Sequence, residues 1–110
     1  MRKINTKPIE RLTIDFNDDE GNLIFSKTLK YSSYAMMVLD EEFEGYIQIA
    51  QDAKTKPFLA GAKIIYAGIK ATEPDFSFDE AKRLIVSMSL EDIAEVFEFA
   101  AKSLGEGKPL

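Results

Sequence analysis

The sequence of 110 residues contains no cysteine, no histidine and no tryptophan. Without cysteine no disulfide can form, so nothing argues for an oxidising compartment. Without histidine or cysteine, thiol nucleophiles, Ser-His triads, histidine general bases and the usual structural zinc sites are excluded together. The other residue types that can do chemistry stand in no recognisable catalytic arrangement. We therefore expect a protein that is not an enzyme and that holds no cofactor and no metal.

Long apolar runs and an excess of positive charge are also missing. The longest nearly uncharged stretch, residues 57–69, is interrupted by Lys63 and is too short to cross a bilayer. The basic residues at the N-terminal end lead into no apolar segment, so no signal peptide is visible and we expect a cytoplasmic protein. The formal net charge of −5 weighs against nucleic acid as a partner, because affinity for phosphates comes largely from Lys and Arg.

What the chain does contain is enough apolar material for one core. Apolar residues make up 45% of the sequence and charged residues 30%, which is typical of a folded domain rather than a disordered chain. A chain of this length builds one core but not two. We therefore predict a single domain over residues 1–110, with a β-hairpin at 9–31, a helical region at 33–104 and a flexible tail at 105–110.

The N-terminal part of this domain alternates between apolar and polar residues, the pattern of strands with one face on a core. Residues 8–17 alternate in this way, and residues 23–31 alternate again, although Lys27 interrupts their apolar face. The stretch between them is rich in turn formers and includes Gly21, which can supply a positive φ. The short spacing predicts an antiparallel hairpin, whose apolar face must lie on the helices or join another sheet. The apolar positions are Leu12, Ile14 and Phe16 in the first strand and Leu23, Phe25, Leu29 and Tyr31 in the second.

After the hairpin the apolar residues recur at helical spacing. A first helix is predicted over residues 33–52, with Gly45 as a weak point at which it can bend or break. A second helix, residues 57–70, begins with proline and is apolar almost all round, so we expect it at the centre of the fold. Two further helices follow Ser77 and Ser89, which are both good N-cap residues. The sequence thus predicts an α+β fold in which an antiparallel β-hairpin precedes a compact bundle of about four α-helices.

Several patterns that suggest chemistry are better explained by structure. Two acidic clusters, at residues 40–44 and 91–98, lack the spacing of a calcium loop and are expected to be solvated helix faces. The last two helices resemble a helix-turn-helix in outline, but Glu91 and Asp92 would repel phosphate at the start of the recognition helix. The glycines of the second helix match no phosphate-binding loop. They belong to a stripe of small residues at which another backbone can approach closely: Ala60, Gly61, Ala67, Gly68 and Ala71.

The link between the second and third helices contains packing and capping residues and no catalytic chemistry. Residues 66–70 (Tyr-Ala-Gly-Ile-Lys) end an apolar helix, and residues 74–80 (Pro-Asp-Phe-Ser-Phe-Asp-Glu) begin an acidic one. This arrangement resembles the tail assembly chaperones of long-tailed phages and prophages. The closing helix is similar as well, with Leu-Glu-Asp-Ile at residues 90–93 followed by Phe97 and Leu104. The resemblance covers residues 57–104.

The resemblance implies a non-enzymatic protein of virion morphogenesis. Chaperones of this family are thought to coat the tape-measure protein, a long hydrophobic helical rod, before tail-tube subunits polymerise around it. An uncoated rod with exposed apolar stripes would aggregate. The resemblance also implies a homo-oligomer in the host bacterial cytoplasm that is absent from the mature virion, with the major tail protein as a second candidate partner. No small-molecule, nucleic-acid or membrane partner is expected.

The contact surfaces expected from this resemblance are the edge of the hairpin and the apolar second helix. The expected partner-binding residues are Phe58, Ile64, Ile65, Tyr66, Gly68, Ile69 and Phe76. One alternative of a different class stays open at this point, a small acidic regulatory or adaptor module built on the same scaffold.

Overall fold

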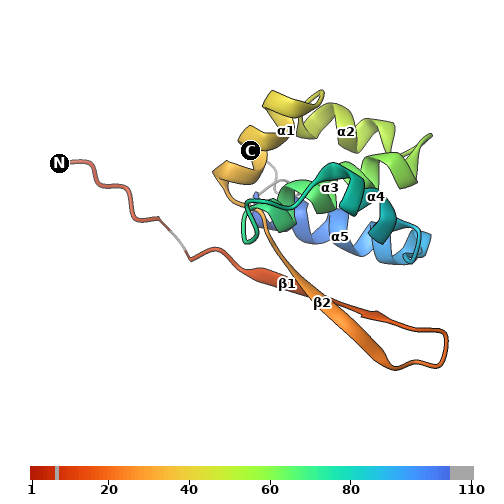
Figure 1. Cartoon of the computed structure of the whole chain (residues 1–110). Helices are drawn as coiled ribbons and strands as arrows, with labels where there is room; N and C mark the ends of the chain where they lie inside the picture. Colours follow the sequence, from red (N-terminus) through yellow and green to blue (C-terminus); the bar gives the residue numbers. More distant parts are fainter. Residues whose placement is uncertain (7, 105–110) are drawn as a thin grey trace.

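The computed structural model describes residues 1–6 and 8–104, and the predicted tail at 105–110 lies outside these residues. It confirms the α+β fold, in which an antiparallel hairpin precedes a group of helices (Figure 1). The helices are five rather than about four. In chain order the elements are β1 (Arg11–Asn17), β2 (Leu23–Lys30), α1 (Ser33–Glu42), α2 (Tyr46–Asp52), α3 (Pro57–Lys70), α4 (Phe78–Ile85) and α5 (Leu90–Ser103).

The additional helix arises because the predicted helix over residues 33–52 is broken into α1 and α2. Gly45 separates the two helices and has a φ of 90°, a backbone conformation that side chains with a β-carbon rarely adopt. Its backbone N–H donates a hydrogen bond to the carbonyl oxygen of Leu39 at 3.1 Å, which closes the end of α1. The weak point expected at this glycine is therefore a complete break that turns the chain.

The two strands pair as the alternation predicts. Leu12 lies opposite Leu29 and Phe16 opposite Phe25, and the two phenylalanine rings stack with their centroids 5.1 Å apart. In the turn, the side chain of Asp18 accepts hydrogen bonds from two backbone N–H groups, and Gly21 has the expected positive φ of 86°. One face of the hairpin is therefore apolar, and the other is formed by charged and hydroxyl side chains.

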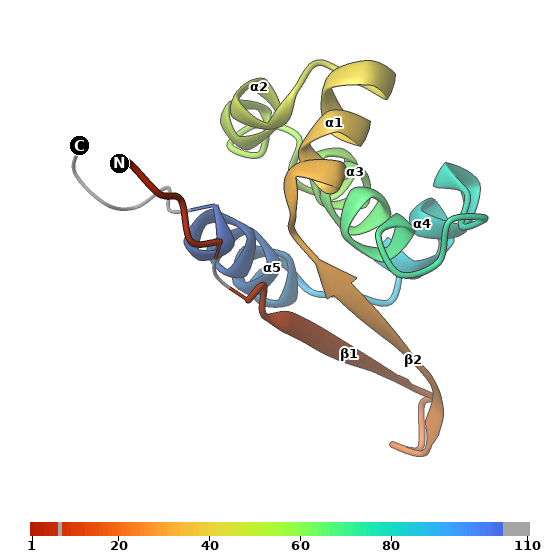
Figure 2. The same cartoon turned by 90° about the vertical axis from the view of Figure 1, so that its left-hand side faces the viewer.

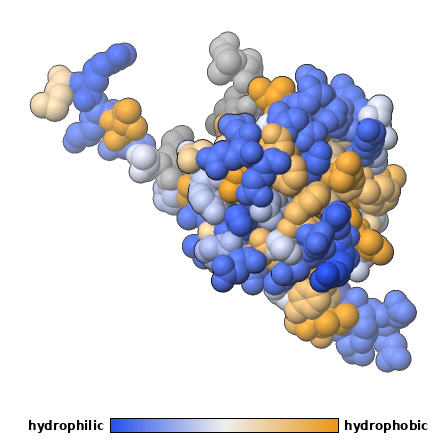
Figure 3. Space-filling view, turned by 45° about the horizontal axis from the view of Figure 1, so that its top comes forward, coloured by the Kyte–Doolittle hydropathy of each residue, from blue (hydrophilic) through white to orange (hydrophobic). Residues whose placement is uncertain are grey.

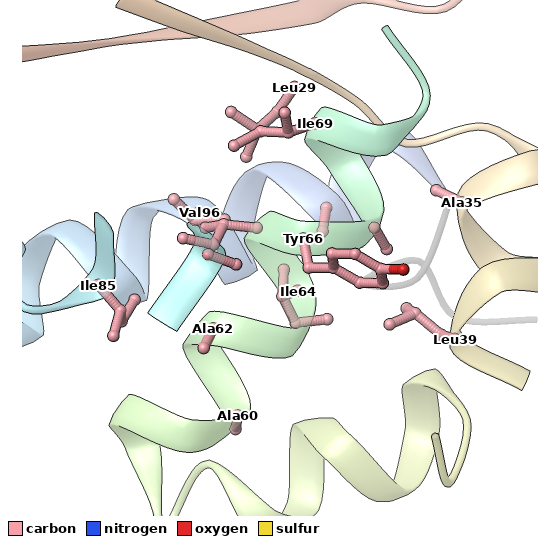
Figure 4. Packing of buried hydrophobic residues seen from close by; sticks show 14 of the residues in the cluster. Leu29, Ala35, Leu39, Ala60, Ala62, Ile64, Tyr66, Ile69, Ile85 and Val96 are labelled. Atoms are coloured by element: carbon pink, nitrogen blue, oxygen red, sulfur yellow. The ribbon is translucent and has the colours of Figure 1, made fainter. Parts of the chain in front are cut away.

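Helix α3 is the central element, as its apolar surface predicts. It packs against β2, α1, α2, α4 and α5, and buried side chains from these elements gather around it (Figures 2 and 4). Nine of its fourteen residues are buried. Among the described residues no helix combines the length and the apolar content needed to span a membrane.

The hairpin is attached to α3 and the residues just after it through the C-terminal half of β2 and Tyr31. The hydroxyl of Thr72, just after α3, donates to the backbone oxygen of Thr28 at 2.9 Å. The ammonium of Lys27 lies 3.1 Å from the carboxylate of Glu73. The half of the hairpin that contains the turn projects beyond the helices (Figures 1 and 2). Leu23 and Ile24, which follow the turn directly, are exposed. Figure 3 shows hydrophobic surface next to the hydrophilic end of the molecule at the bottom of the view.

Both predicted serine caps are present. The side chain of Ser77 accepts a hydrogen bond from the backbone N–H of Glu80 at 3.2 Å. Ser89 forms a full capping box, because its side chain accepts from the N–H of Asp92 while the Asp92 carboxylate accepts from the Ser89 N–H. These caps fix the points at which α4 and α5 begin.

Candidate protein-binding surface

Two tyrosine hydroxyls inside the fold are hydrogen-bonded to groups of the same chain. The hydroxyl of Tyr31 donates a hydrogen bond to the backbone oxygen of Ile64 at 2.8 Å, and burial raises the pKa of this phenol well above its usual value. The hydroxyl of Tyr66 donates to the carboxylate of Glu42 at 2.6 Å, and burial together with this hydrogen bond raises its pKa also. Both phenols therefore remain protonated donors at neutral pH. Across residues 1–6 and 8–104, no group of three or more acidic side chains is placed to hold a metal ion.

The link after α3 is held closed by a cluster of aromatic rings. Phe43 and Tyr66 have ring centroids 5.8 Å apart, and Tyr66 lies 5.7 Å from Phe78 and 6.4 Å from Phe76. Lysine ammonium groups lie over several of these rings, for example Lys63 at 5.4 Å from the Phe43 centroid. The aromatic residues of the segment that resembles the chaperone family therefore contact each other within this chain.

Six of the seven residues expected to bind a partner are buried in the protein's own core. They are Ile64, Ile65, Tyr66, Gly68, Ile69 and Phe76. Phe58, in the first turn of α3, is the one with an exposed side chain, at 47%. A helix that is apolar all round is surrounded by the other elements of its own fold, and α3 fits this rule. Of the seven expected residues, Phe58 is therefore the one whose side chain is open to a partner in this structure.

One open apolar surface is the α1–α2 groove, a concavity of about 550 Å³ at the break between these helices. Ile47 stands beside it with 67% of its surface exposed, and Met36 contributes a half-buried thioether. Asp40 and Glu44 place carboxylates on its rim. The lining residues are Met36, Asp40, Glu44, Gly45, Tyr46, Ile47, Gln48, Gln51 and Leu104. The groove exists because Gly45 ends α1 and redirects the chain.

One carboxylate of this rim is held in place from α3. The Glu44 side chain is 2.9 Å from the ammonium of Lys63, and this hydrogen bond lowers the pKa of the carboxyl group. Glu44 therefore stays negatively charged well below neutral pH. The groove therefore combines a carboxylate paired with Lys63, the exposed carboxylate of Asp40 and the apolar side chains of Met36 and Ile47.

A second concavity, the β1–α5 groove, has a volume of about 420 Å³ and lies between the hairpin and the last helix. Its apolar lining residues come from both sides and stand among polar ones: Leu12, Ile14, Phe16, Met88 and Val96. Its charged lining residues are the carboxylates Asp15, Asp92 and Glu95. The α1–α2 groove was not predicted from the sequence, whereas the β1–α5 groove lies along the hairpin, whose edge was expected as a contact surface. Gly45 signals the break that makes the first groove, and the unpaired strand of a lone hairpin signals the second.

Comparisons with known proteins give no further assignment: no family model, no curated protein and no solved structure matches this chain.

Proposed function

We propose that this protein is a tail assembly chaperone of a long-tailed phage or prophage, which binds the tape-measure protein and helps tail-tube assembly without catalysing a reaction. The observation that carries the proposal is the α1–α2 groove, an open concavity in which the apolar side chains of Met36 and Ile47 stand among polar ones. The sequence resemblance over residues 57–104 supplies the class of client.

The groove suits an amphipathic helix. Client helices of this kind insert apolar side chains at helical spacing into a groove of complementary shape. Met36 adapts to varied side chains because its thioether is flexible and polarisable, and Ile47 offers a large exposed apolar surface. The exposed carboxylate of Asp40 favours a client whose apolar stripe is flanked by Lys or Arg.

The proposed mode of action is coverage by many weak contacts. A rod with a repeated apolar stripe binds many copies of a small chaperone, and copies that also contact each other gain avidity. Each contact stays weak enough for subunits of the major tail protein to displace it. The chaperone thus acts as a homo-oligomer in the host cytoplasm and is absent from the mature virion.

Co-expression with the tape-measure protein encoded in the same phage or prophage tests the proposal. We expect the tape-measure protein to remain in the soluble fraction and to co-purify with this chain. An unrelated acidic protein of similar size serves as the control for a general effect of negative charge. Equal precipitation of the tape-measure protein with this chain and with the control would contradict the proposal.

The net charge of −5 and the acidic rims of both grooves favour one alternative, a regulatory or adaptor module that binds a basic segment of another protein. Neighbouring genes separate the two functions. A gene for a major tail protein upstream and a very long tape-measure gene downstream support the chaperone.

A further inference from the structure

Residues 1–6 form an extended arm outside the fold. Every residue of the arm is exposed, and the side chain of Ile4 is 91% exposed. The arm leaves the start of β1 and leads away from the helices, on the opposite side from the hairpin turn (Figure 1). It has a basic and apolar composition, with Arg2 and Lys3 next to Ile4. An exposed isoleucine on an extended basic segment is suited to a partner surface that is apolar and acidic.

The β1–α5 groove is a surface of that kind. Within the described residues the sheet has two strands, so β1 pairs with β2 on one side and its other edge has no strand partner. Leu12 and Ile14 are only half-buried there, although they belong to the apolar face of the hairpin. Asp92 and Glu95 add negative charge from α5. An unpaired edge beside apolar side chains is the usual acceptor for an added strand.

We propose that the arm of one copy of this protein adds as a third strand to β1 of a second copy and fills the β1–α5 groove. Six extended residues span about 20 Å, close to the length of the seven-residue β1. Side chains alternate along a strand, so Arg2 and Ile4 share one face and Lys3 takes the other. With Ile4 on the apolar lining residues, Arg2 faces the carboxylates of α5.

The other face of the added strand meets charges of both signs on β1. On the outer face of β1, Asp15 accepts a hydrogen bond from the hydroxyl of Ser26, and Arg11 lies on the same face. Lys3, on the outer face of the arm, therefore contributes little to the choice of occupant. The inner face selects the arm of this chain, because Ile4 meets apolar side chains there and Arg2 meets the carboxylates of α5.

The direction of the arm assigns it to a neighbouring copy rather than to its own groove. Folding back would require the chain to reverse within the few residues between the arm and Arg11. The arm instead continues away from the hairpin and the helices (Figure 1), and all six of its residues are exposed. Arm and groove are different surfaces, so the contact is head-to-tail and extends into a ring or an open chain of copies. This contact supplies the self-association in the proposed function but does not depend on the client.

The test uses two full-length charge-reversal variants, Arg2→Glu in the arm and Glu95→Arg in the groove. Sedimentation velocity over a range of concentrations measures self-association in the absence of any client. Each variant alone is expected to weaken self-association by about three- to tenfold, because a favourable charge pair becomes a repulsive one. Glu41→Arg, an equal charge change on the exposed end of α1 and outside both grooves, is the control and is expected to behave as wild type.

An equimolar mixture of the two variants shows whether the arm binds the groove of a neighbouring copy or the groove of its own copy. In the mixture each arm finds a compatible groove on the other variant, so association is expected to return to the wild-type level. Recovery in the double variant Arg2→Glu/Glu95→Arg without recovery in the mixture would show that the arm occupies its own groove and would overturn the proposal. A wild-type protein that is monomeric at all concentrations, or association that neither variant changes, would overturn it too. Arg2 lies outside the fold, so the Arg2→Glu variant remains informative even where Glu95→Arg lowers stability. A failure of the arm proposal would leave the proposed binding of the client untouched.

Discussion

The ring of Tyr31 lies directly on the backbone of Gly68. A β-carbon at Gly68 would stand 2.7 Å from Cζ and 2.8 Å from the hydroxyl oxygen of Tyr31, closer than real β-carbons approach their neighbours. The same hydroxyl donates its hydrogen bond to the backbone oxygen of Ile64, one turn earlier in α3. The hairpin can therefore reach α3 this closely only because position 68 has no side chain.

Gly68→Ala is expected to destabilise the protein. Overpacking against the Tyr31 ring costs about 1–3 kcal/mol, and this exceeds the gain of up to about 1 kcal/mol that alanine brings to a helix interior. The free energy of unfolding measured in urea checks this prediction. Gly61→Ala is the matched control, because it makes the same change in the same helix.

The neighbours of the two glycines differ in how far they can move. At Gly61 a β-carbon would meet only side-chain carbons of Ile85 and Ile93, at 3.0–3.3 Å, and these can shift slightly. Gly68→Ala should thus be the less stable variant by about 1 kcal/mol or more. Equal stabilities would show that the Tyr31 ring moves aside without cost.

Stability should fall at alkaline pH because of the two buried phenols. Folding raises the pKa of Tyr31 and Tyr66 above the ordinary value of 10.0, so the unfolded chain loses these protons first. Their contribution is fully present below about pH 10 and is lost as the pH rises further. The free energy of unfolding should decrease by about 1.4 kcal/mol per pH unit for each phenol that ionises only on unfolding.

Unfolding in urea at several pH values between 9 and about 12 measures this slope. Tyr31→Phe removes one titrating group, and its curve should fall less steeply than that of wild type. Tyr34→Phe is the control, because Tyr34 is 44% exposed. If the unfolding free energy of Tyr31→Phe falls with pH as steeply as that of wild type, Tyr31 is not a source of the alkaline loss of stability.

Ile47→Asp tests whether the α1–α2 groove binds the client. The side chain is 67% exposed, so its loss should change the unfolding free energy by less than about 0.5 kcal/mol. A charge on the apolar side of the groove should nevertheless abolish the protection of the tape-measure protein in co-expression. Val86→Asp makes the same kind of change at a residue that is 83% exposed and outside both grooves. This control variant should keep the tape-measure protein soluble as well as wild type does. Equal loss in both variants, or in neither, would remove the groove from the mechanism.

The fold was largely predictable because its signals are local. The alternation around Phe16 and Leu29 specified the inward face of the hairpin, and both residues are buried. Pro57 and the serine caps marked the starts of three helices where the structure places them. Gly45 marked the break between α1 and α2, but the apolar period continues across it, so the pattern alone favoured one long helix.

The open surfaces of the helical part were not predictable, because apolarity does not distinguish a residue in the core from one on a binding surface. The sequence of α3 from Ile64 to Ile69 is the most apolar in the chain, and for that reason the fold buries it. The helical period over residues 33–52 likewise does not show that Ile47 is exposed. Its exposure depends on how α2 is turned after Gly45, which is a tertiary property.

The ties between hairpin and helix also have a consequence for synthesis. Lys27 and Glu73 are 46 residues apart in the chain, and Thr28 and Thr72 are separated by 44. The hairpin leaves the ribosome first and can close its own turn at once, since its pairing is local. The helix α3 and the residues after it that bind the hairpin do not exist until translation has passed Glu73. The nascent strands therefore remain undocked while most of the helical part is still being made.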